Sequence, residues 1–83
     1  MGSYMFLHLG EDTVVLTKDI IVIMDMDGAT ISKFSRELLR KGELDGNIVT
    51  VSSLLPRTII ITLDNKIYLS PVSASTLLKK SNL

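Results

Sequence analysis

The apolar and polar positions of the N-terminal segment predict short strands. Large residues alternate along residues 4–9, residues 10–12 have the composition of a turn, and residues 13–16 are a short β-branched run. Two such runs on either side of a turn are typical of a hairpin. Residues 20–24 form a continuous apolar run that is too short for a long helix and rich in β-branched side chains. We therefore predict a buried strand there.

Residues 30–41 are the one long amphipathic segment, and they predict the main helix. Thr30 is a suitable N-cap, Gly42 suits the left-handed position after the last turn, and Lys41 complements the negative C-terminal end. At about 100° per residue, a mainly apolar face lies opposite a basic one. The first face consists of Ile31, Phe34, Ser35, Leu38 and Leu39, and the basic face consists of Lys33, Arg36 and Arg40.

The C-terminal third predicts a second hairpin that is apolar on both sides. Two short apolar segments flank Asp64 and Asn65, residue types that tolerate the positive φ of a two-residue turn. Such a turn pairs Ile61 with Tyr68. Because the hairpin needs two covers, we predict that the main helix covers one face and another copy of the chain covers the other. The candidates for the face that the helix leaves uncovered are Ile59, Ile61, Leu63 and Tyr68.

The remaining segments complete the order of elements. Residues 48–51 predict a short strand, Pro71 ends the last strand, and residues 73–80 predict a short helix capped by Ser73. Strands, a helix, further strands and a short helix indicate an α+β domain. We expect a small, mostly antiparallel sheet with one main helix and a short C-terminal helix.

Composition limits what such a domain can do. A chain of 83 residues buries only ~60% of its unfolded surface, so its core is thin and association with other copies is one remedy. It contains no cysteine, and no apolar run approaches the ~20 residues that cross a membrane. We expect residues 1–3 to be a cloning remnant and residues 4–83 to be a single cytoplasmic domain without membrane contact.

The charged residues cancel in number but are unevenly distributed. The formal net charge is zero, which argues against a strongly basic nucleic-acid-binding protein. The charged side chains of residues 1–27 are mostly acidic, and those of residues 33–41 are mostly basic. The basic helix face suits contacts to DNA phosphates, and it equally suits the solvated face of any surface helix. Arg57 follows Pro56 at the start of a strand, which suits phosphate recognition or the capping of a neighbouring acid.

No group of residues forms a catalytic or metal-binding constellation. His8 is the only histidine, and it lies in a predicted strand where a structural or surface role is the ordinary one. Asp25 and Asp27 could attract a cation from one strand end, although hard-cation sites need more converging oxygen ligands. The scattered glycines form no phosphate-binding loop, and the serines suit caps and connectors. We therefore expect no enzyme, no cofactor and no metal.

Two stretches of the sequence carry the motifs of a known family. The first reads HLGEDTVV at residues 8–15, TKDII at residues 17–21 and IMD at residues 23–25, and the second reads KIYLSPVSASTLLKK at residues 66–80. Together they resemble the extracellular-matrix regulator family of Gram-positive bacteria, the RemA/RemB group, and most closely its regulator B branch. The resemblance covers nearly the whole chain after residue 3 and is weakest over residues 30–55.

The resemblance implies a DNA-binding regulator of biofilm-matrix genes that forms ring-shaped homo-oligomers. A ring needs a heterologous interface between successive copies, which fits the two-faced hairpin. Repetition also converts a few phosphate contacts per copy into avidity. Relatives of the regulator A branch carry an arginine where this chain has Lys18 and Asp19, and adjacent arginines where it has Leu54 and Leu55.

We therefore predict a non-enzymatic transcriptional regulator that binds double-stranded DNA as a ring-shaped homo-oligomer. The alternative is a homo-oligomeric scaffold that binds another protein, such as a related regulator, and does not bind DNA. The zero net charge and the two leucines favour this alternative. The residues that we predict to contact DNA phosphates are Lys18, Arg57, Arg36, Arg40 and Lys41.

Overall fold

The computed structural model describes residues 6–26 and 33–81, and within them the backbone forms two sheets and two helices. Each predicted strand has a counterpart, and a short 3-10 turn, η1, connects the first hairpin to the main sheet. The elements in chain order are β1 (Phe6–Gly10), β2 (Thr13–Leu16), η1 (Thr17–Asp19), β3 (Ile20–Asp25), α1 (Lys33–Asp45), β4 (Ile48–Thr50), β5 (Thr58–Thr62), β6 (Ile67–Ser70) and α2 (Ala74–Ser81).

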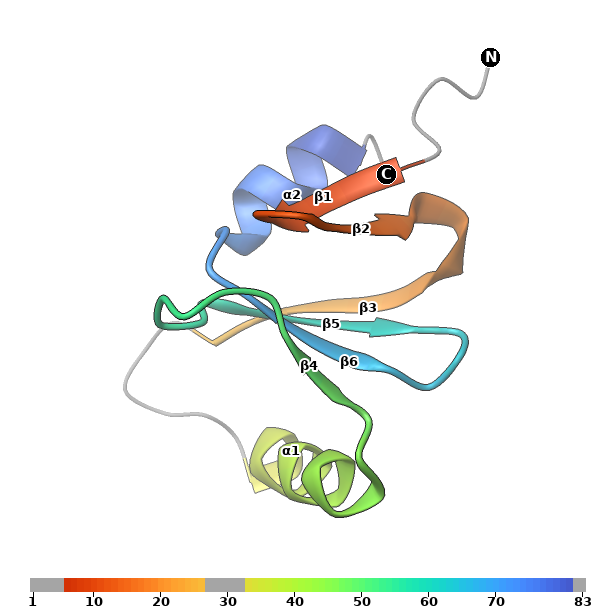
Figure 1. Ribbon diagram of the computed structural model, residues 1–83, viewed down its shortest axis with the longest axis vertical. Helices are drawn as coiled ribbons and strands as arrows, with labels where there is room; N and C mark the ends of the chain where they lie inside the picture. Colours follow the sequence, from red (N-terminus) through yellow and green to blue (C-terminus); the bar gives the residue numbers. More distant parts are fainter. Residues whose placement is uncertain (1–5, 27–32, 82–83) are drawn as a thin grey trace.

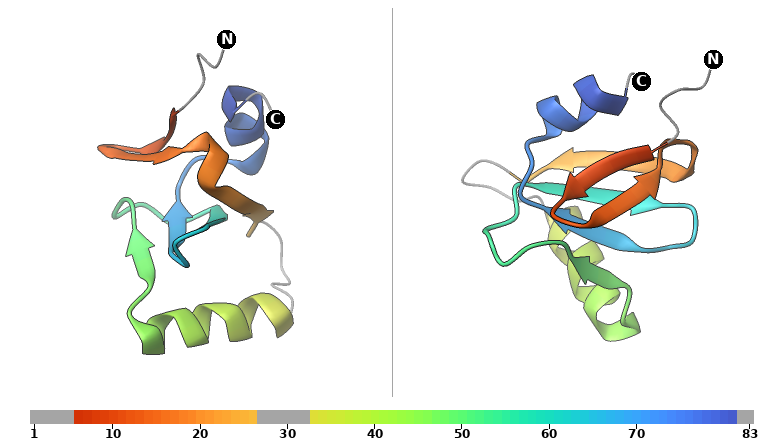
Figure 2. Two further views of the ribbon diagram at one scale, coloured as in Figure 1. Left: turned by 90° about the vertical axis from the view of Figure 1, so that its right-hand side faces the viewer. Right: turned by 45° about the horizontal axis from the view of Figure 1, so that its top comes forward.

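The four-stranded sheet is the middle layer, with the strand order β3-β5-β6-β4. Helix α1 lies below this sheet, and the β1–β2 hairpin lies above it together with α2 (Figure 1). The turned views in Figure 2 show the same three layers. Neighbouring strands are antiparallel except β4, which pairs parallel with β6. The predicted α+β fold with a mostly antiparallel sheet, one main helix and a short C-terminal helix is confirmed.

The core lies between the central sheet and the upper layer. Leu7 and Leu9 of β1 are buried against Ile60 of β5, and Leu77 of α2 belongs to the same cluster. Tyr68 packs against this cluster from β6. Because Leu7 and Leu9 are two residues apart, they share the inner face of β1, as the alternation in the sequence predicts.

Helix α1 ends later than predicted, because Gly42 continues the helix and Gly46 ends it. The Asn47 N–H donates to the Gly42 carbonyl at 2.8 Å, and the Gly46 N–H donates to the Glu43 carbonyl at 3.2 Å. These two bonds form a Schellman motif, whose left-handed residue is Gly46 with φ of +71°. The prediction that Gly42 holds this position was wrong. The predicted cap Thr30 lies outside the described residues.

Gly42 instead lies where α1 approaches the sheet. A Cβ atom at this position would meet Cδ1 of Ile67 at 2.7 Å and Cγ1 of Ile48 at 3.1 Å. The missing side chain lets the helix backbone come close to β6. The other α1 side chains that the structure describes are exposed or half-buried, so the helix covers this face of the sheet only in part.

The second hairpin forms as predicted, but its loop and its register differ. The Asn65 N–H donates to the Thr62 carbonyl at 2.9 Å, and the Thr62 N–H donates to the Lys66 carbonyl at 3.1 Å. The loop therefore contains three residues, Leu63, Asp64 and Asn65, and of these only Asn65 has a positive φ, at 69°. A type I′ turn needs positive φ at both central residues, whereas this loop type needs it once.

The longer loop shifts every pair by one residue. Tyr68 lies opposite Ile60, not opposite Ile61, and Ile61 lies opposite Ile67. Opposed residues share a face of the sheet, so Tyr68 joins the upper core, whereas Ile59 and Ile61 face the α1 side. The predicted register, and with it the single face that combined these side chains, was wrong.

Candidate functional site

The basic residues that were predicted to contact DNA do not converge on one place. Strands β3 and β5 are antiparallel, with Ile20 opposite Thr62 and Asp25 opposite Thr58. Lys18 precedes β3 and Arg57 precedes β5, so the two lie at opposite ends of this ladder. Six residues of β3 span about 20 Å at ~3.4 Å per residue. One protomer therefore presents Lys18 and Arg57 as separate charges.

Arg57 is presented by a fixed backbone. Its N–H donates to the Ser70 carbonyl at 2.8 Å, and its carbonyl accepts from the Met26 N–H at 2.8 Å. Arg57 is exposed, and it makes a further interaction within its own protomer. Since the backbone is held on both sides, the guanidinium extends from a defined point at one end of the sheet.

Helix α1 presents a second basic group. Arg36 and Arg40 are both exposed and lie four residues apart, so they share one face of the helix. The Ser35 hydroxyl lies 3.9 Å from the Met24 sulfur, which places the first turns of α1 near the end of β3. This is the end of the sheet at which Arg57 lies. The structure thus brings Arg36 towards the end with Arg57 and leaves Lys18 apart.

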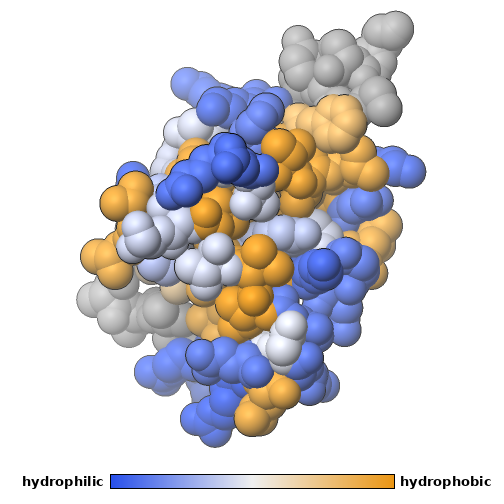
Figure 3. All heavy atoms as spheres, viewed as in Figure 1, coloured by the Kyte–Doolittle hydropathy of each residue, from blue (hydrophilic) through white to orange (hydrophobic). Residues whose placement is uncertain are grey.

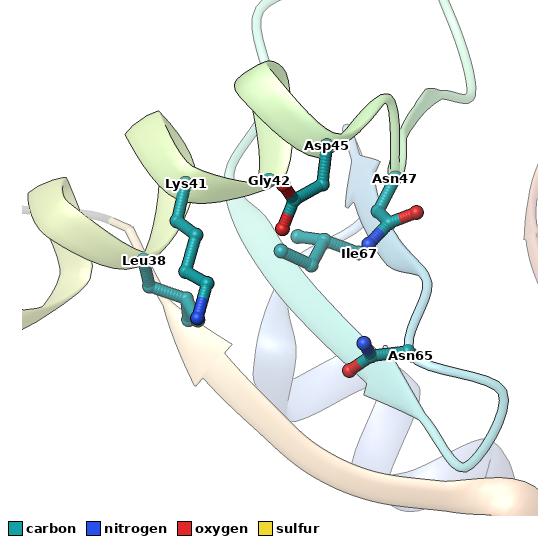
Figure 4. A pocket seen from close by; sticks show the side chains of 7 residues that line it. All are labelled: Leu38, Lys41, Gly42, Asp45, Asn47, Asn65 and Ile67. Carbon is teal, nitrogen blue, oxygen red and sulfur yellow. The ribbon is translucent and has the colours of Figure 1, made fainter.

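Lys41 belongs to a small hollow at the C-terminal half of α1 (Figure 4). This hollow has a volume of about 150 Å³. Gly42 and Ile67 form its apolar floor, and charged and amide side chains surround the floor. The lining residues are Leu38, Lys41, Gly42, Asp45, Asn47, Asn65 and Ile67. Lys41 therefore has a local setting that Arg36 and Arg40 do not share.

A second hollow, of about 180 Å³, lies at the end of β5 and carries two carboxylates, Asp19 and Asp64. The backbone joins the two segments, because the Leu63 N–H donates to the Asp19 carbonyl at 2.8 Å. The Thr62 hydroxyl donates to a carboxylate oxygen of Asp64, and this hydrogen bond is the main reason that the pKa of Asp64 lies below its ordinary value. We call this site the acidic hollow, and its lining residues are Val14, Val15, Leu16, Asp19, Thr62, Asp64 and Tyr68.

Sequence reasoning missed the acidic hollow. Its lining comes from the adjacent elements β2 and η1 and from the second hairpin, which lies far from them along the chain. The only local signal was the acidic residue in each of the two connections, Asp19 and Asp64. Their proximity depends on the pairing of β3 with β5, which no local pattern specifies.

The connector between β4 and β5 exposes two adjacent leucines. Leu54 is 67% exposed and Leu55 is 87% exposed. The Leu54 N–H donates to the Ser52 hydroxyl at 3.0 Å, and Ser52 itself is buried, so the connector is anchored. Figure 3 shows hydrophobic atoms at the left margin of the molecule, where Figure 1 places this connector. We call residues 54–57, which include Arg57, the leucine loop.

The four predicted interface residues lie in three different settings. Ile59 is 1% exposed within its own protomer, whereas Leu63 is 67% exposed. Ile61 and Tyr68 are half-buried on opposite faces of the sheet. Their role in an interface between copies stays a prediction, and Leu63 is the member that the protomer leaves most accessible.

The remaining candidates from the sequence form no further site in the part of the chain that the structure describes. His8 is exposed in β1 opposite Val14. Residues 6–26 and 33–81 contain no group of three or more histidine or acidic side chains that could hold a metal ion. Asp27 lies outside the described residues, so its pairing with Asp25 stays untested. None of the described helices is long and apolar enough to cross a membrane.

Comparison with known proteins gives two matches. Residues 6–80 match the model of the RemA-like family, described as extracellular matrix regulatory protein A-like. The chain is also similar to the extracellular matrix regulatory protein B of Bacillus subtilis strain 168, with 40% identity over 77 residues. This match covers 93% of the chain and 90% of that protein. The family match extends over both hairpins, α1, nearly all of α2 and both hollows.

Proposed function

The chain belongs to the RemA-like family of extracellular matrix regulatory proteins, and from this premise we propose that it is a transcriptional regulator of matrix genes that binds double-stranded DNA as a ring-shaped homo-oligomer. The family is one of regulators and not of enzymes. The resemblance recognised in the sequence motifs is thereby confirmed. The proposal adds three parts to the family membership: control of transcription, DNA binding and the ring.

The observation that carries DNA binding is the exposed basic row on α1. Arg36 and Arg40 face solvent on one side of the helix, and Lys33, three residues before Arg36, is also exposed on this side. Arginine side chains recognise phosphates through two parallel hydrogen bonds. A zero net charge gives one protomer little attraction for DNA, so the proposal requires repeated copies whose contacts add.

The ring is supported by the apolar surface that one protomer leaves open. Leu54, Leu55, Leu63 and Ile21 are each more than half exposed. These exposed apolar side chains are candidates for a surface that another copy covers, since two of them, Leu54 and Leu55, are adjacent and a contiguous exposed apolar patch is typical of an interaction site. They lie at more than one end of the sheet, which suits a heterologous contact between successive copies.

A scaffold that binds a related regulator, and not DNA, is the second candidate. The anchored connector favours it, because it presents Leu54 and Leu55, and leucine has no affinity for phosphate. The zero net charge points in the same direction. In this candidate the basic row on α1 is a solvated helix face.

A salt titration of duplex DNA binding separates the two candidates. We expect binding at about 50 mM salt that weakens steeply as salt is raised, because phosphate contacts release counterions. Arg36→Glu/Arg40→Glu should weaken binding. It should also reduce the slope of log affinity against log salt concentration by about two for each bound copy, because two phosphate contacts are lost. Lys79→Glu/Lys80→Glu on α2 is the matched control, since it changes the charge equally on the opposite side of the sheet.

The outcome is informative in either direction. Loss of binding in the α1 variant alone supports the proposal, whereas equal losses in both variants would assign binding to net charge and not to the α1 row. Wild-type protein that does not bind DNA even at about 50 mM salt would overturn DNA binding and leave the scaffold candidate.

A further inference from the structure

We propose that the leucine loop of one copy docks into the acidic hollow of a second copy, so that successive copies join head to tail. This inference rests on the homo-oligomer of the proposed function and names its contact surfaces. The occupant of the acidic hollow is a second copy of this chain.

The position of the two surfaces requires a second copy. The leucine loop precedes β5 and the acidic hollow lies at its other end, beside Thr62. Strand β5 contains five residues, a span of about 17 Å at ~3.4 Å per residue. A protomer therefore cannot fill its own hollow with its own loop. Two different surfaces at opposite ends form a heterologous contact, which repeats from copy to copy and closes into a ring when the rotation allows it.

The charges of the two surfaces are complementary. Arg57 brings a cation to the leucine loop, and Asp19 and Asp64 bring two carboxylates to the hollow. Arginine pairs with carboxylates through parallel N–H···O bonds. Arg57 also interacts within its own protomer, so docking requires that at least one of its five N–H donors bonds to a carboxylate of the neighbouring copy.

The hollow also suits the rest of an arginine side chain. Tyr68 lines it with an aromatic ring, and a guanidinium stacks well on such a face. The hydrogen bond from the Thr62 hydroxyl lowers the pKa of Asp64, so this carboxylate is charged at neutral pH. A volume of about 180 Å³ leaves room for a side chain of this size.

Apolar side chains flank both surfaces. Leu55 and Leu54 lie two and three residues before Arg57, so they reach the rim of the hollow when the guanidinium enters it. At that rim Val14 is 40% exposed, and Leu63, next to Asp64, is 67% exposed. A charged contact surrounded by apolar side chains excludes water, which strengthens the hydrogen bonds at its centre.

The test compares loop variants with hollow variants in the full chain. Arg57→Gln removes the cation, and Asp19→Asn/Asp64→Asn removes the two charges while it keeps groups that can accept the local hydrogen bonds. We expect each to raise the dissociation constant between copies about 30-fold, measured by light scattering over a dilution series. This factor corresponds to about 2 kcal/mol, the lower range for breaking a buried charge pair.

A second loop variant checks that weaker association does not result from misfolding. Leu55→Ser changes a side chain that is 87% exposed, so folding should be unaffected while association weakens. Lys79→Gln and Asp12→Asn are matched controls, since each removes one charge from an exposed residue outside both surfaces. We expect both controls to associate as the wild type does.

Mixing identifies the head-to-tail geometry. Arg57→Gln retains an intact hollow and Asp19→Asn/Asp64→Asn retains an intact loop, so an equal mixture should form dimers of one copy each and no larger species. The variant that combines all three substitutions should associate no more weakly than either parent, because both remove the same contact.

Two results would overturn the inference in distinguishable ways. If the wild type forms oligomers and the loop and hollow variants keep its dissociation constant, the docking is wrong and the proposed ring stands. If the wild type is a monomer at micromolar concentration, the homo-oligomer of the proposed function is itself wrong.

Discussion

Replacement of Gly42 by alanine tests how α1 rests on the sheet. In an exposed helix interior this change stabilises a protein by about 0.5–1 kcal/mol, because glycine loses more backbone entropy on folding. Here a Cβ atom would lie 2.7 Å from Cδ1 of Ile67 and 3.1 Å from Cγ1 of Ile48. Ile67 is only 5% exposed, so its Cδ1 moves within packed surroundings.

The two effects have opposite signs, and their sizes decide the result. An extra methyl group in a packed interface costs about 1–3 kcal/mol. After the gain in helix propensity, we expect Gly42→Ala to destabilise the fold by about 1 kcal/mol. For a domain of this size the melting temperature should fall by about 4–8 °C.

Urea unfolding monitored by circular dichroism measures this change in the free energy of unfolding. Glu43→Ala is the control, since Glu43 is exposed at the next position of the helix and should change stability by less than about 0.5 kcal/mol. If Gly42→Ala instead stabilised the protein by 0.5 kcal/mol or more, the helix would not contact Ile67 in solution as the structure describes.

Three further predictions concern single hydrogen bonds and one backbone angle. Gly46→Ala should lower the free energy of unfolding by about 1–2 kcal/mol, because φ of +71° is unfavourable for alanine. The new methyl group would contact no other atom, so it gains no packing energy to offset this strain. An unchanged midpoint of urea unfolding would contradict this prediction. Ser70→Ala should lower the free energy of unfolding by about 1–3 kcal/mol. The reason is that the buried hydroxyl donates to the Leu9 carbonyl and accepts from the Val72 N–H. An unchanged free energy of unfolding in the same assay would mean that water replaces the hydroxyl. The lowered pKa of Asp64 predicts a small stabilisation that is present above the ordinary pKa of 3.8 and is lost as pH falls through the folded value. Thr62→Val should reduce this pH dependence of the melting temperature, because it removes the largest cause of the lowered pKa. An unaltered profile would exclude the hydrogen bond as the main cause.

The second hairpin shows where sequence reasoning reached its limit in the fold. Its strands and its position follow from β-branched residues on either side of Asp64 and Asn65. Its register depends on whether one or two loop residues adopt a positive φ, and both residue types tolerate either arrangement. Because the side-chain period in a strand is two, this one choice moved Tyr68 to the opposite face from Ile61.

The end of α1 shows the same limit at a glycine. The sequence offers Gly42 and Gly46 within one stretch of polar residues, and either could hold the left-handed position after a helix. The close approach of Gly42 to Ile67 assigns the first glycine to packing and leaves the second to end the helix. A contact between residues 25 positions apart in the chain decided this, and local propensity does not contain it.

The sequence by itself determined the class of fold, the order of the elements and the family, because periodicity, turn residues and motifs are local or contiguous properties. Only the tertiary structure decided which charges meet. The antiparallel pairing of β3 with β5 separates Lys18 from Arg57 and brings Asp19 beside Asp64. The physical reason is that strand pairing joins residues by register and direction, so distance along the chain does not predict distance in space.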